Sequence, residues 1–233
     1  MSYSKNITSI IVPFYNEEAS LKESILNLVS QEFKKEIILI NDGSTDRSKE
    51  IGVELSEKFK YIKLIDNNRN RGKGFAVRLG IDNADGDLIA IYDADLEYSA
   101  LDLSKLIECI RNKNLDFVCG SRFIGNEIRK NIYFRTLYAN KFLSLLFTYV
   151  YKNKITDIAV CLKVFKKEII KSIDFEKDDF AIEVELIAKV LSKTNKYKEI
   201  PISYKGRSYK EGKKIKLVDG FKYILAIFRY KWK

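Results

Sequence analysis

The stretch "LIAIYDADLEYS", residues 88–99, joins an apolar run to three acidic residues. The apolar run predicts a buried β-strand, and Asp93, Asp95 and Glu97 follow it at intervals of two. Residues two apart on an extended chain point the same way, so these carboxylates could converge on one point. A hard divalent cation bound together with phosphate oxygens is their natural partner. The alternative is an acidic loop that caps the next helix, but the preceding strand favours the metal.

Outward from this stretch, short β-branched runs alternate with amphipathic helical patterns through the first half of the chain. We predict strands at 8–14, 36–42, 61–67 and 87–95, with helices at 17–32, 43–59 and 74–83. Strands that alternate with helices of this length imply right-handed βαβ units and a mostly parallel sheet. The predicted fold class is therefore α/β.

All four predicted strands end in polar, loop-forming residues. The segments are "PFYNEE" (13–18), "NDGSTD" (41–46), "NNRNRGKG" (67–74) and "DADLEY" (93–98). Because ligands bind at the carboxyl ends of the strands in such sheets, the coincidence predicts a site at this edge. The third segment places three cations among two glycines at the start of a helix, which favours a bound diphosphate over a solvated basic turn.

Charge is unevenly distributed along the chain, whose net charge is +10. Residues 1–110 hold 14 Lys and Arg against 19 Asp and Glu, whereas residues 111–233 hold 28 against 13. The basic half must therefore face an anionic partner: nucleic acid, a phosphorylated small molecule or a membrane surface. No nucleic-acid-binding motif is present, and the aromatic residues follow amphipathic helical spacing, so we expect no nucleic acid partner.

Two segments of the basic half have the pattern of helices that lie on a membrane surface. In 131–154 the apolar face comprises Phe142, Leu145, Leu146, Tyr149 and Val150. In the C-terminal segment it comprises Phe221, Ile224, Leu225 and Phe228. Both segments are too short and polar to span a bilayer, and anionic lipid would attract their cations. The alternative is that both helices simply pack on the sheet.

The cysteine and histidine counts limit the class of protein further. Three scattered cysteines and no histidine argue against a disulfide framework and against a zinc site. Residues 1–6 are polar, and no apolar run approaches the roughly 18–20 residues that cross a membrane. We therefore expect a cytosolic protein with reduced cysteines.

Several segments together resemble a known family. "SIIVPFYNEEASL", "ILINDGSTDRS", "NRGKGFAVRLGIDNADGD", "YDADLEY" and "GSRF" occur in the order and spacing of family 2 glycosyltransferases with the GT-A fold. "TDIAVCLKVFKKEII", "FAIEVELIAKV" and "EIPISYKGRSYKEGKKIKLVDGFK" resemble the branch of dolichyl- and polyprenyl-phosphate sugar synthases. The resemblance implies an inverting transfer of sugar from a UDP- or GDP-sugar to a polyprenyl phosphate, with Mg²⁺ or Mn²⁺. The alternative acceptor is a sugar hydroxyl of a growing polysaccharide.

The resemblance also assigns roles to individual residues. The nucleotide-sugar would be bound by Pro13, Tyr15, Glu17, Asp42, Lys73 and Asp93. The metal ligands would be Asp93 and Asp95, with Glu97 as a third where relatives usually have Gln. The acceptor phosphate would be held by Arg122, Arg135 and Arg207. The residues implied to act in catalysis are Asp93, Asp95, Arg122 and Asp157.

The acceptor decides whether a general base is needed. A lipid phosphate is already ionised near neutral pH, whereas a sugar hydroxyl must lose a proton to a carboxylate, for which Asp157, Glu183 and Glu185 are candidates. We expect instead that Asp157 positions a loop and that Glu183 or Glu185 orients a basic residue. The departures from the family pattern, "TDIAVCLK" and "FAIEVE", both lie in the acceptor half.

The expected organisation follows the same division. Residues 1–212 would form the GT-A catalytic domain, with a nucleotide-sugar and metal half (1–110) and an acceptor half (111–212), and residues 213–233 a basic amphipathic helix. Many relatives continue with transmembrane helices where this chain ends. We therefore expect a peripheral protein on the cytoplasmic face of the membrane, bound to anionic lipid directly or through a membrane-anchoring partner. The exposed helices could alternatively form a homodimer.

Overall fold

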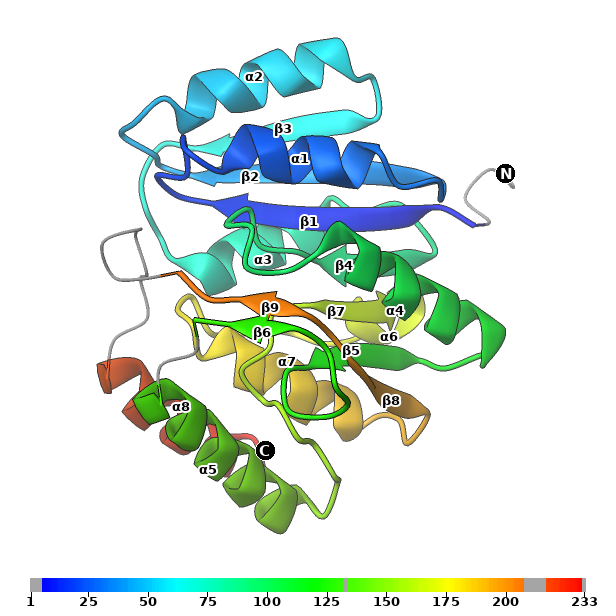
Figure 1. Ribbon diagram of the computed structural model, residues 1–233, viewed down its shortest axis with the longest axis vertical. Helices are drawn as coiled ribbons and strands as arrows, with labels where there is room; N and C mark the ends of the chain where they lie inside the picture. The colour runs from blue at the N-terminus through cyan, green and yellow to red at the C-terminus, as the bar shows by residue number, and fades with distance from the viewer. Residues whose placement is uncertain (1–5, 132–133, 208–216, 232–233) are drawn as a thin grey trace.

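A seven-stranded sheet forms the centre of the molecule in the computed structural model, which describes residues 6–131, 134–207 and 217–231 (Figure 1). The strands are β1 (Thr8–Phe14), β2 (Lys35–Asp42), β3 (Ile62–Asn67), β4 (Leu88–Ile91), β5 (Phe117–Ser121), β6 (Arg129–Lys130), β7 (Lys163–Lys166), β8 (Tyr197–Pro201) and β9 (Tyr204–Lys205). The helices are α1 (Leu21–Val29), α2 (Ser48–Lys58), α3 (Lys73–Asp82), α4 (Ala100–Asn112), α5 (Phe134–Tyr151), α6 (Lys167–Ile170), α7 (Ile182–Leu191) and α8 (Leu217–Arg229).

The sheet has the strand order β3-β2-β1-β4-β7-β5-β8 and is mostly parallel. β1 pairs in parallel with both β2 and β4, and β8 pairs in parallel with β5. Only β7 among the strands of this sheet runs antiparallel to its neighbours β4 and β5. The apolar runs of β1 and β4 are buried throughout, as expected for strands covered on both faces. The predicted α/β class is confirmed.

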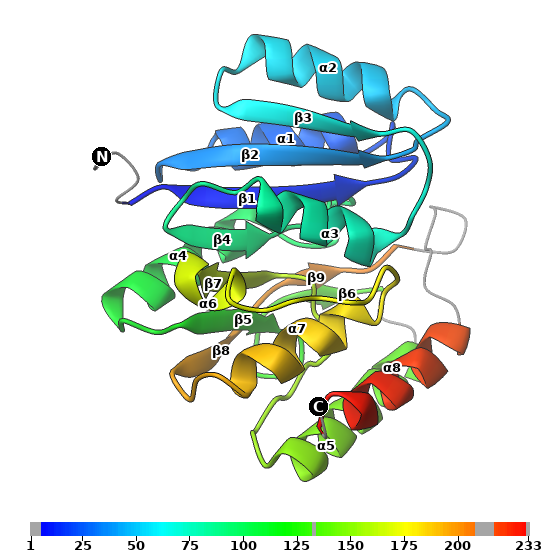
Figure 2. The same cartoon turned by 180° about the vertical axis from the view of Figure 1, so that it is seen from behind.

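Helices cover both faces of the sheet. α1 and α4 lie on one face, and α3 and α7 lie on the other (Figures 1 and 2). α1 buries Leu21, Ile25 and Leu28, which share one helical face at spacings of four and three. α3 approaches β1 closely because Gly80 has no side chain: a Cβ there would lie 2.3 Å from the Ile11 side chain. These contacts hold the βα connections in register with the sheet.

The chain turns sharply after β4. Tyr92 still donates its main-chain N–H to Ile11, but the predicted strand 87–95 ends at Ile91. Leu96 then adopts a left-handed φ of 61°, which reverses the chain before α4. Asp93, Asp95 and Glu97 therefore lie in a turn and not on an extended strand. The other predicted strands and helices of the first half are present, although α1 and α2 begin later than predicted.

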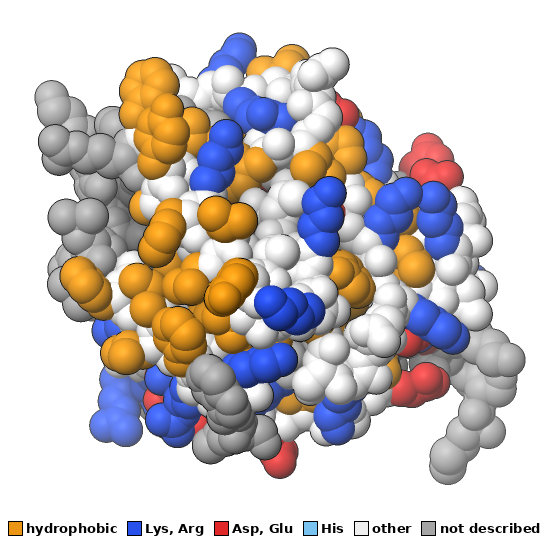
Figure 3. Space-filling model, turned by 90° about the horizontal axis from the view of Figure 1, so that it is seen from below, with side chains coloured by type: hydrophobic (Ala, Val, Ile, Leu, Met, Phe, Trp, Pro, Cys, Tyr) orange, Lys and Arg blue, Asp and Glu red, His pale blue; other side chains and the backbone are white. Residues whose placement is uncertain are grey.

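α5 and α8 pack side by side at the lower end of the molecule in Figure 1, and α8 also packs against α7. Each presents an apolar face to solvent: Phe134, Tyr138, Phe142, Leu145 and Tyr149 on α5, and Phe221, Leu225 and Phe228 on α8. This set of side chains is called the exposed apolar face below. Figure 3 views that end of the molecule and shows hydrophobic side chains gathered there, with Lys and Arg around them.

Three further expectations from the sequence concern membrane-spanning helices, the boundary between domains and the cysteines. Across the described ranges, no helix combines the length and apolar character needed to cross a membrane. The predicted boundary between residues 212 and 213 falls in the 208–216 segment, outside the described residues, so the division into domains stays a prediction. All three cysteines are free, and their reduced state stays a prediction.

Candidate active site at the carboxyl ends of the strands

Asp42, at the end of β2, fixes the basic loop that leads into α3. Its Oδ1 accepts hydrogen bonds from the Arg71 main-chain N–H (2.9 Å) and the Asn67 amide (3.1 Å), and its Oδ2 accepts one from the Gly72 N–H (2.8 Å). Gly72 has a φ of 102°, a conformation that favours glycine. The carboxylate thus sets the course of the loop, and the nucleoside contact predicted for Asp42 stays a prediction.

Lys73 begins α3 and lies between two carboxylates. Its Nζ is 2.8 Å from Asp93 Oδ1 and 2.9 Å from Glu183 Oε1. Glu183, on α7, also binds the fully buried Lys163 on β7. Burial raises the pKa of the Glu183 carboxyl, but Lys163 and Lys73 outweigh this effect, so its pKa lies below the ordinary value. Glu183 therefore orients Lys73 toward Asp93, in agreement with the expectation from the sequence.

Arg207 connects three acidic residues of the donor half. Its Nη1 lies 2.8 Å from Glu17 Oε2, its Nη2 lies 3.0 Å from Asp95 Oδ2, and its main-chain N–H donates to Glu97 Oε1 at 2.8 Å. We call Glu17, Asp95 and Glu97 the acidic cluster below. The sequence placed Arg207 with the acceptor phosphate, but the structure places its side chain among the donor-half carboxylates. The turn after β4 brings Glu97 to β9, which explains the difference.

The Asp95 carboxyl is crowded by negative charge. Burial, and then the neighbouring carboxylates Asp93 and Glu97, raise its pKa to about 7, although Arg207 acts in the opposite direction. Ser99, and none of the three carboxylates, caps α4 by accepting the Leu101 N–H. The alternative interpretation of the acidic turn as a helix cap is therefore wrong.

The predicted metal ligands do not form a ready-made metal site. Within the described parts of the chain, no three His, Cys, Asp or Glu side chains are arranged to hold an ion by themselves. Both Glu97 carboxylate oxygens are engaged, one by Arg207 and the other by the Tyr204 hydroxyl at 2.7 Å. A hard cation usually takes only one or two carboxylates and completes its shell with phosphate oxygens and water. Asp93 and Asp95 would suit such a cation once Lys73 and Arg207, which contact their oxygens here, give way to it, whereas the three-carboxylate set is not assembled.

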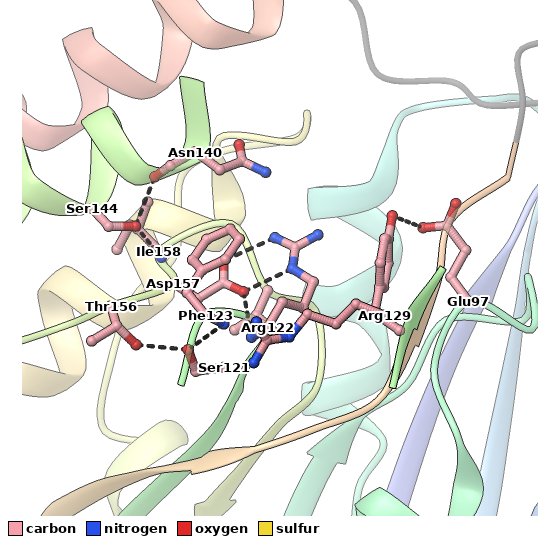
Figure 4. Close-up of polar contacts among 12 residues, drawn as sticks. Glu97, Ser121, Arg122, Phe123, Arg129, Asn140, Ser144, Thr156, Asp157 and Ile158 are labelled. Carbon is pink, nitrogen blue, oxygen red and sulfur yellow. Dashed lines mark hydrogen bonds and ion pairs between the residues drawn. The ribbon is translucent and has the colours of Figure 1, made fainter. Parts of the chain in front are cut away.

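Arg122 and Asp157 form a buried ion pair on the acceptor side (Figure 4). Arg122 donates from Nε (2.7 Å) and from the main chain (3.0 Å) to Asp157 Oδ2, and from Nη2 to Oδ1 (2.8 Å). Asp157 is fully buried, and its loop is held because Glu199 accepts the N–H groups of Thr156 and Asp157. Asp157 thus positions both Arg122 and the "TD" loop.

Tyr204 links Arg122 to the acidic turn after β4. Its ring lies 5.0 Å from the Arg122 guanidinium, and its hydroxyl donates to Glu97. Burial raises the pKa of Tyr204 well above its usual value, and the neighbouring Glu97 acts in the same direction, so the hydroxyl stays a hydrogen-bond donor. We did not single out Tyr204, Lys163 or Glu199 from the sequence. The one sequence feature that could have pointed to Tyr204 is its position three residues before Arg207, in a segment that resembles the family.

The remaining predicted residues are less closely tied to this constellation. Pro13 lies within β1 opposite Ile40, and Tyr15 follows the end of that strand, half-buried. Glu17 is buried and accepts a hydrogen bond from Ser20 at 2.9 Å. The Arg135 side chain lies outside the described part of the structure, so its predicted contact with the acceptor stays a prediction.

The fold and the site together define a class of protein. A mostly parallel sheet, with a basic loop and acidic side chains at the carboxyl ends of its strands, is the architecture of GT-A glycosyltransferases. Glucosyl-3-phosphoglycerate synthase from Mycobacterium tuberculosis, solved with Mn²⁺, UDP and glucosyl-3-phosphoglycerate, superimposes with a TM-score of 0.76, covering 98% of this chain and 81% of that one. The sequence identity is 13%, so this likeness establishes the fold.

The family follows from the sequence. The chain belongs to glycosyl transferase family 2, whose model matches residues 9–174. Similar proteins include the dolichol-phosphate mannosyltransferase of Pyrococcus furiosus, 31% identical over 96% of this chain and 64% of that protein. The dolichyl-phosphate beta-glucosyltransferase of Mus musculus is 29% identical over 90% of this chain and 69% of that protein. The chain thus spans less than two thirds of the Pyrococcus protein. The predicted family and GT-A fold are confirmed.

Proposed function

We propose that this protein is a metal-dependent, inverting glycosyltransferase that moves a sugar from a UDP- or GDP-sugar to a polyprenyl phosphate such as dolichyl or undecaprenyl phosphate. The names of the Pyrococcus and mouse relatives support the lipid acceptor. The Mn²⁺ and UDP bound to the structural neighbour support the metal and a nucleotide donor. One observation in this chain carries the choice of acceptor: the candidate bases are already engaged.

None of the three carboxylates considered as bases is placed to take a proton from a sugar hydroxyl. Asp157 accepts from Arg122 through both oxygens, Glu183 lies between two lysines, and Glu185 accepts two main-chain N–H groups. The oxygens of these carboxylates already accept hydrogen bonds or ion pairs, and they would have to release these partners before taking a proton from a hydroxyl. A phosphate acceptor is ionised near neutral pH and needs none, so the geometry favours it over a glycan hydroxyl.

The chain's own residues then bind and orient the two substrates. Asp157 holds the Nε–Nη2 edge of the Arg122 guanidinium, and the remaining terminal nitrogen, which has no hydrogen bond to a described residue, would donate to the acceptor phosphate. Lys73, at the start of α3, would neutralise the donor diphosphate. An acceptor oxygen attacks the anomeric carbon opposite the diphosphate, whose bond to that carbon breaks, so the configuration inverts.

Asp93 and Asp95 would hold the divalent cation together with diphosphate oxygens. When bound, this cation offsets the negative charge that develops on the leaving nucleoside diphosphate. The cation in this proposal is Mg²⁺ or Mn²⁺.

A transfer assay with radiolabelled sugar tests the proposal. Purified protein is incubated with a panel of UDP- and GDP-sugars, Mg²⁺ or Mn²⁺, and undecaprenyl or dolichyl phosphate, with Asp95→Ala as the inactive control. We expect the label to enter the organic phase only with wild-type protein and only with added lipid phosphate. Label that appears solely in a water-soluble glycan would contradict the lipid acceptor and favour the glycan hydroxyl.

We further propose that the exposed apolar face of α5 and α8 rests on an anionic membrane surface, where the acceptor lipid resides. The face carries large apolar side chains, such as Phe134 (76% exposed) and Phe221 (71% exposed), and basic side chains lie around it (Figure 3). Apolar insertion and attraction of cations to anionic headgroups act together in such contacts. Reduced cysteines and a nucleotide-sugar donor favour the cytoplasmic face. An anchoring partner or a homodimer on the same face is the alternative.

Co-sedimentation with vesicles tests this surface. Phe221→Ser/Leu225→Ser should lower binding to vesicles rich in phosphatidylglycerol several-fold, because two exposed apolar anchors are lost. Leu101→Ser is the matched control, since Leu101 is 64% exposed but lies on α4 and should bind like the wild type. If the double variant binds equally well but changes from dimer to monomer in light scattering, the face is a protein interface instead.

A further inference from the structure

Arg207 holds one of the carboxylate oxygens that a divalent cation would need, Oδ2 of Asp95. Its guanidinium lies against Glu17 and Asp95, and its main-chain N–H fixes Glu97. All these side chains are at most 18% exposed, so water screens their charges little. A guanidinium is charged at every physiological pH and matches carboxylates with its planar fork. Arg207 is therefore a permanent cation in the acidic cluster.

The charge in this region leaves room for more positive charge. When every carboxylate is ionised, Asp93, the acidic cluster and Glu183 carry five negative charges against the three positive charges of Lys73, Lys163 and Arg207, which leaves an excess of two. An excess of two suits a divalent ion. Asp95, however, could not bind such an ion through Oδ2 while Nη2 of Arg207 lies 3.0 Å from that oxygen.

The Arg207 side chain is not fully satisfied where it lies. Its buried Nε has no hydrogen-bond partner in the described part of the structure, and the nearest carboxylate oxygen, Glu97 Oε1, is 3.9 Å away. A buried charged donor without a partner destabilises the arrangement that contains it. An anion entering this edge of the sheet could satisfy Nε and draw the guanidinium away from Asp95.

We propose that Arg207 is a built-in competitor of the divalent cation: its guanidinium neutralises the acidic cluster until a metal–nucleotide complex exchanges with it. The proposal rests on the proposed metal-dependent function. Metal alone must displace Arg207 without offering it a new partner, so it binds weakly. Metal that arrives with a diphosphate supplies an anion for the displaced guanidinium, so the two ligands bind cooperatively. The positive charge of Arg207 thereby disfavours binding of the metal before the nucleotide.

The test measures Mn²⁺ binding without donor or acceptor, from the electron paramagnetic resonance signal of free Mn²⁺. Arg207→Met removes the competing charge and should tighten the Kd for Mn²⁺ alone about tenfold or more. In the same variant, the additional tightening produced by UDP should shrink. Arg207→Lys keeps a charge but not the fork and should fall between the two, which covers the case that Arg207→Met does not fold. Arg129→Met is the matched control, because Arg129 donates to the carbonyls of Ile124 and Gly125 in an exposed loop.

Equal or weaker Mn²⁺ binding by the Arg207 variants, with or without UDP, would overturn the competitor role. This failure is distinguishable from failure of the proposed function. If the wild type transfers sugar to lipid phosphate and only the Mn²⁺ result is negative, the competitor role alone is wrong. If the variants gain Mn²⁺ affinity but no transfer to lipid phosphate occurs, the competitor role stands and the acceptor is wrong.

Discussion

At the residue scale, the site consists of charged side chains removed from water and made tolerable by partners distant in sequence. Arg122 and Asp157 are separated by 35 residues, and Arg207 and Asp95 by 112. Buried pairs of this kind contribute little net stability, but losing one partner leaves an uncompensated charge. Their main contribution is therefore to positioning: they hold hydrogen-bond donors and acceptors in place before any substrate binds.

Removing Arg122 should be costly for stability. Arg122→Met leaves the fully buried Asp157 carboxylate without its cation, and we expect the free energy of unfolding to fall by about 3–5 kcal/mol. Urea denaturation followed by circular dichroism measures the loss. Adding Asp157→Asn to the first change should recover part of it, because no charge is then stranded. A double variant no more stable than Arg122→Met would show that the pair does not act as a unit.

The acidity of Asp95 gives a pH dependence. Since its pKa is raised to about 7, the carboxyl is protonated below that pH and charged above it, so Mn²⁺ affinity should rise as pH increases through 7. The folded protein favours the protonated form of Asp95, so the free energy of unfolding falls as the pH rises from about 4 to about 7. Asp95→Asn should therefore raise the free energy of unfolding at pH 8 by about 2–4 kcal/mol and leave it nearly unchanged at pH 4.

Mn²⁺ titration and thermal unfolding across this pH range check both effects. Glu57→Gln, an exposed carboxylate on α2, is the control and should change neither quantity. A wild-type Mn²⁺ affinity that is flat from pH 6 to pH 8 would contradict the assignment to Asp95 (about one pH unit on either side of its pKa).

Sequence reasoning found the acidic and basic residues of the site but not their mutual arrangement. The carboxylates after β4 were recognisable because they interrupt an apolar run. Their partners were not, because Arg207 and Tyr204 reach them only through the pairing of β6 with β9 and the turn at Leu96. A guanidinium that suits an acceptor phosphate suits a carboxylate equally well, so residue type alone could not distinguish the two positions.

At the scale of elements, the first half of the fold was predictable because each segment has a single pattern of apolar residues, that of a strand or that of a helix. β1 is buried along its whole length, and α1 has one apolar face. The second half was harder to predict. β7 has four residues, β6 and β9 have two each, and their pairings join segments far apart in the sequence. Short strands carry too few residues for a period to be read.

Two helical glycines should respond oppositely to the same change. Gly80→Ala places a methyl group against Ile11 where α3 meets β1, and overpacking of this kind should lower the free energy of unfolding by about 1–3 kcal/mol. Gly220→Ala in α8 meets nothing within 4 Å and should raise it by about 0.5–1 kcal/mol through helix propensity. Urea unfolding of both variants checks the pair. Equal effects at both positions would contradict the close packing of α3.

At the scale of the whole molecule, the two halves divide the chemistry between them. Residues 1–110, with a net charge of −5, supply the donor-side acidic residues, and residues 111–233, with a net charge of +15, supply the exposed apolar face and its cations. Tyr204 and Arg207 belong to the second half but contact the acidic turn of the first. The site therefore requires both halves of the chain.

Salt should separate the two contributions to membrane binding. Raising the ionic strength from about 0.1 M to about 1 M shortens the Debye length to about 3 Å, so the attraction of the basic side chains to anionic vesicles should largely disappear. We expect binding to fall but not vanish, because the apolar face is insensitive to screening. Vesicle co-sedimentation across a salt series measures this. Binding that does not change with salt would contradict a role for the basic half.

The antiparallel strand β7 has a consequence for how the chain is made. β4 ends at Ile91 and the strand that pairs with its other edge, β7, begins at Lys163, so 71 residues lie between the two strands. At the usual rate of synthesis, about 5–20 residues per second, the open side of β4 emerges several seconds before the strand that covers it. During that interval the ribosome carries a half-built sheet with an exposed apolar edge, the kind of surface that molecular chaperones recognise. The pairing of β7 with β4 is therefore a late event in synthesis, and until it occurs the unpaired edge of β4 is prone to aggregation.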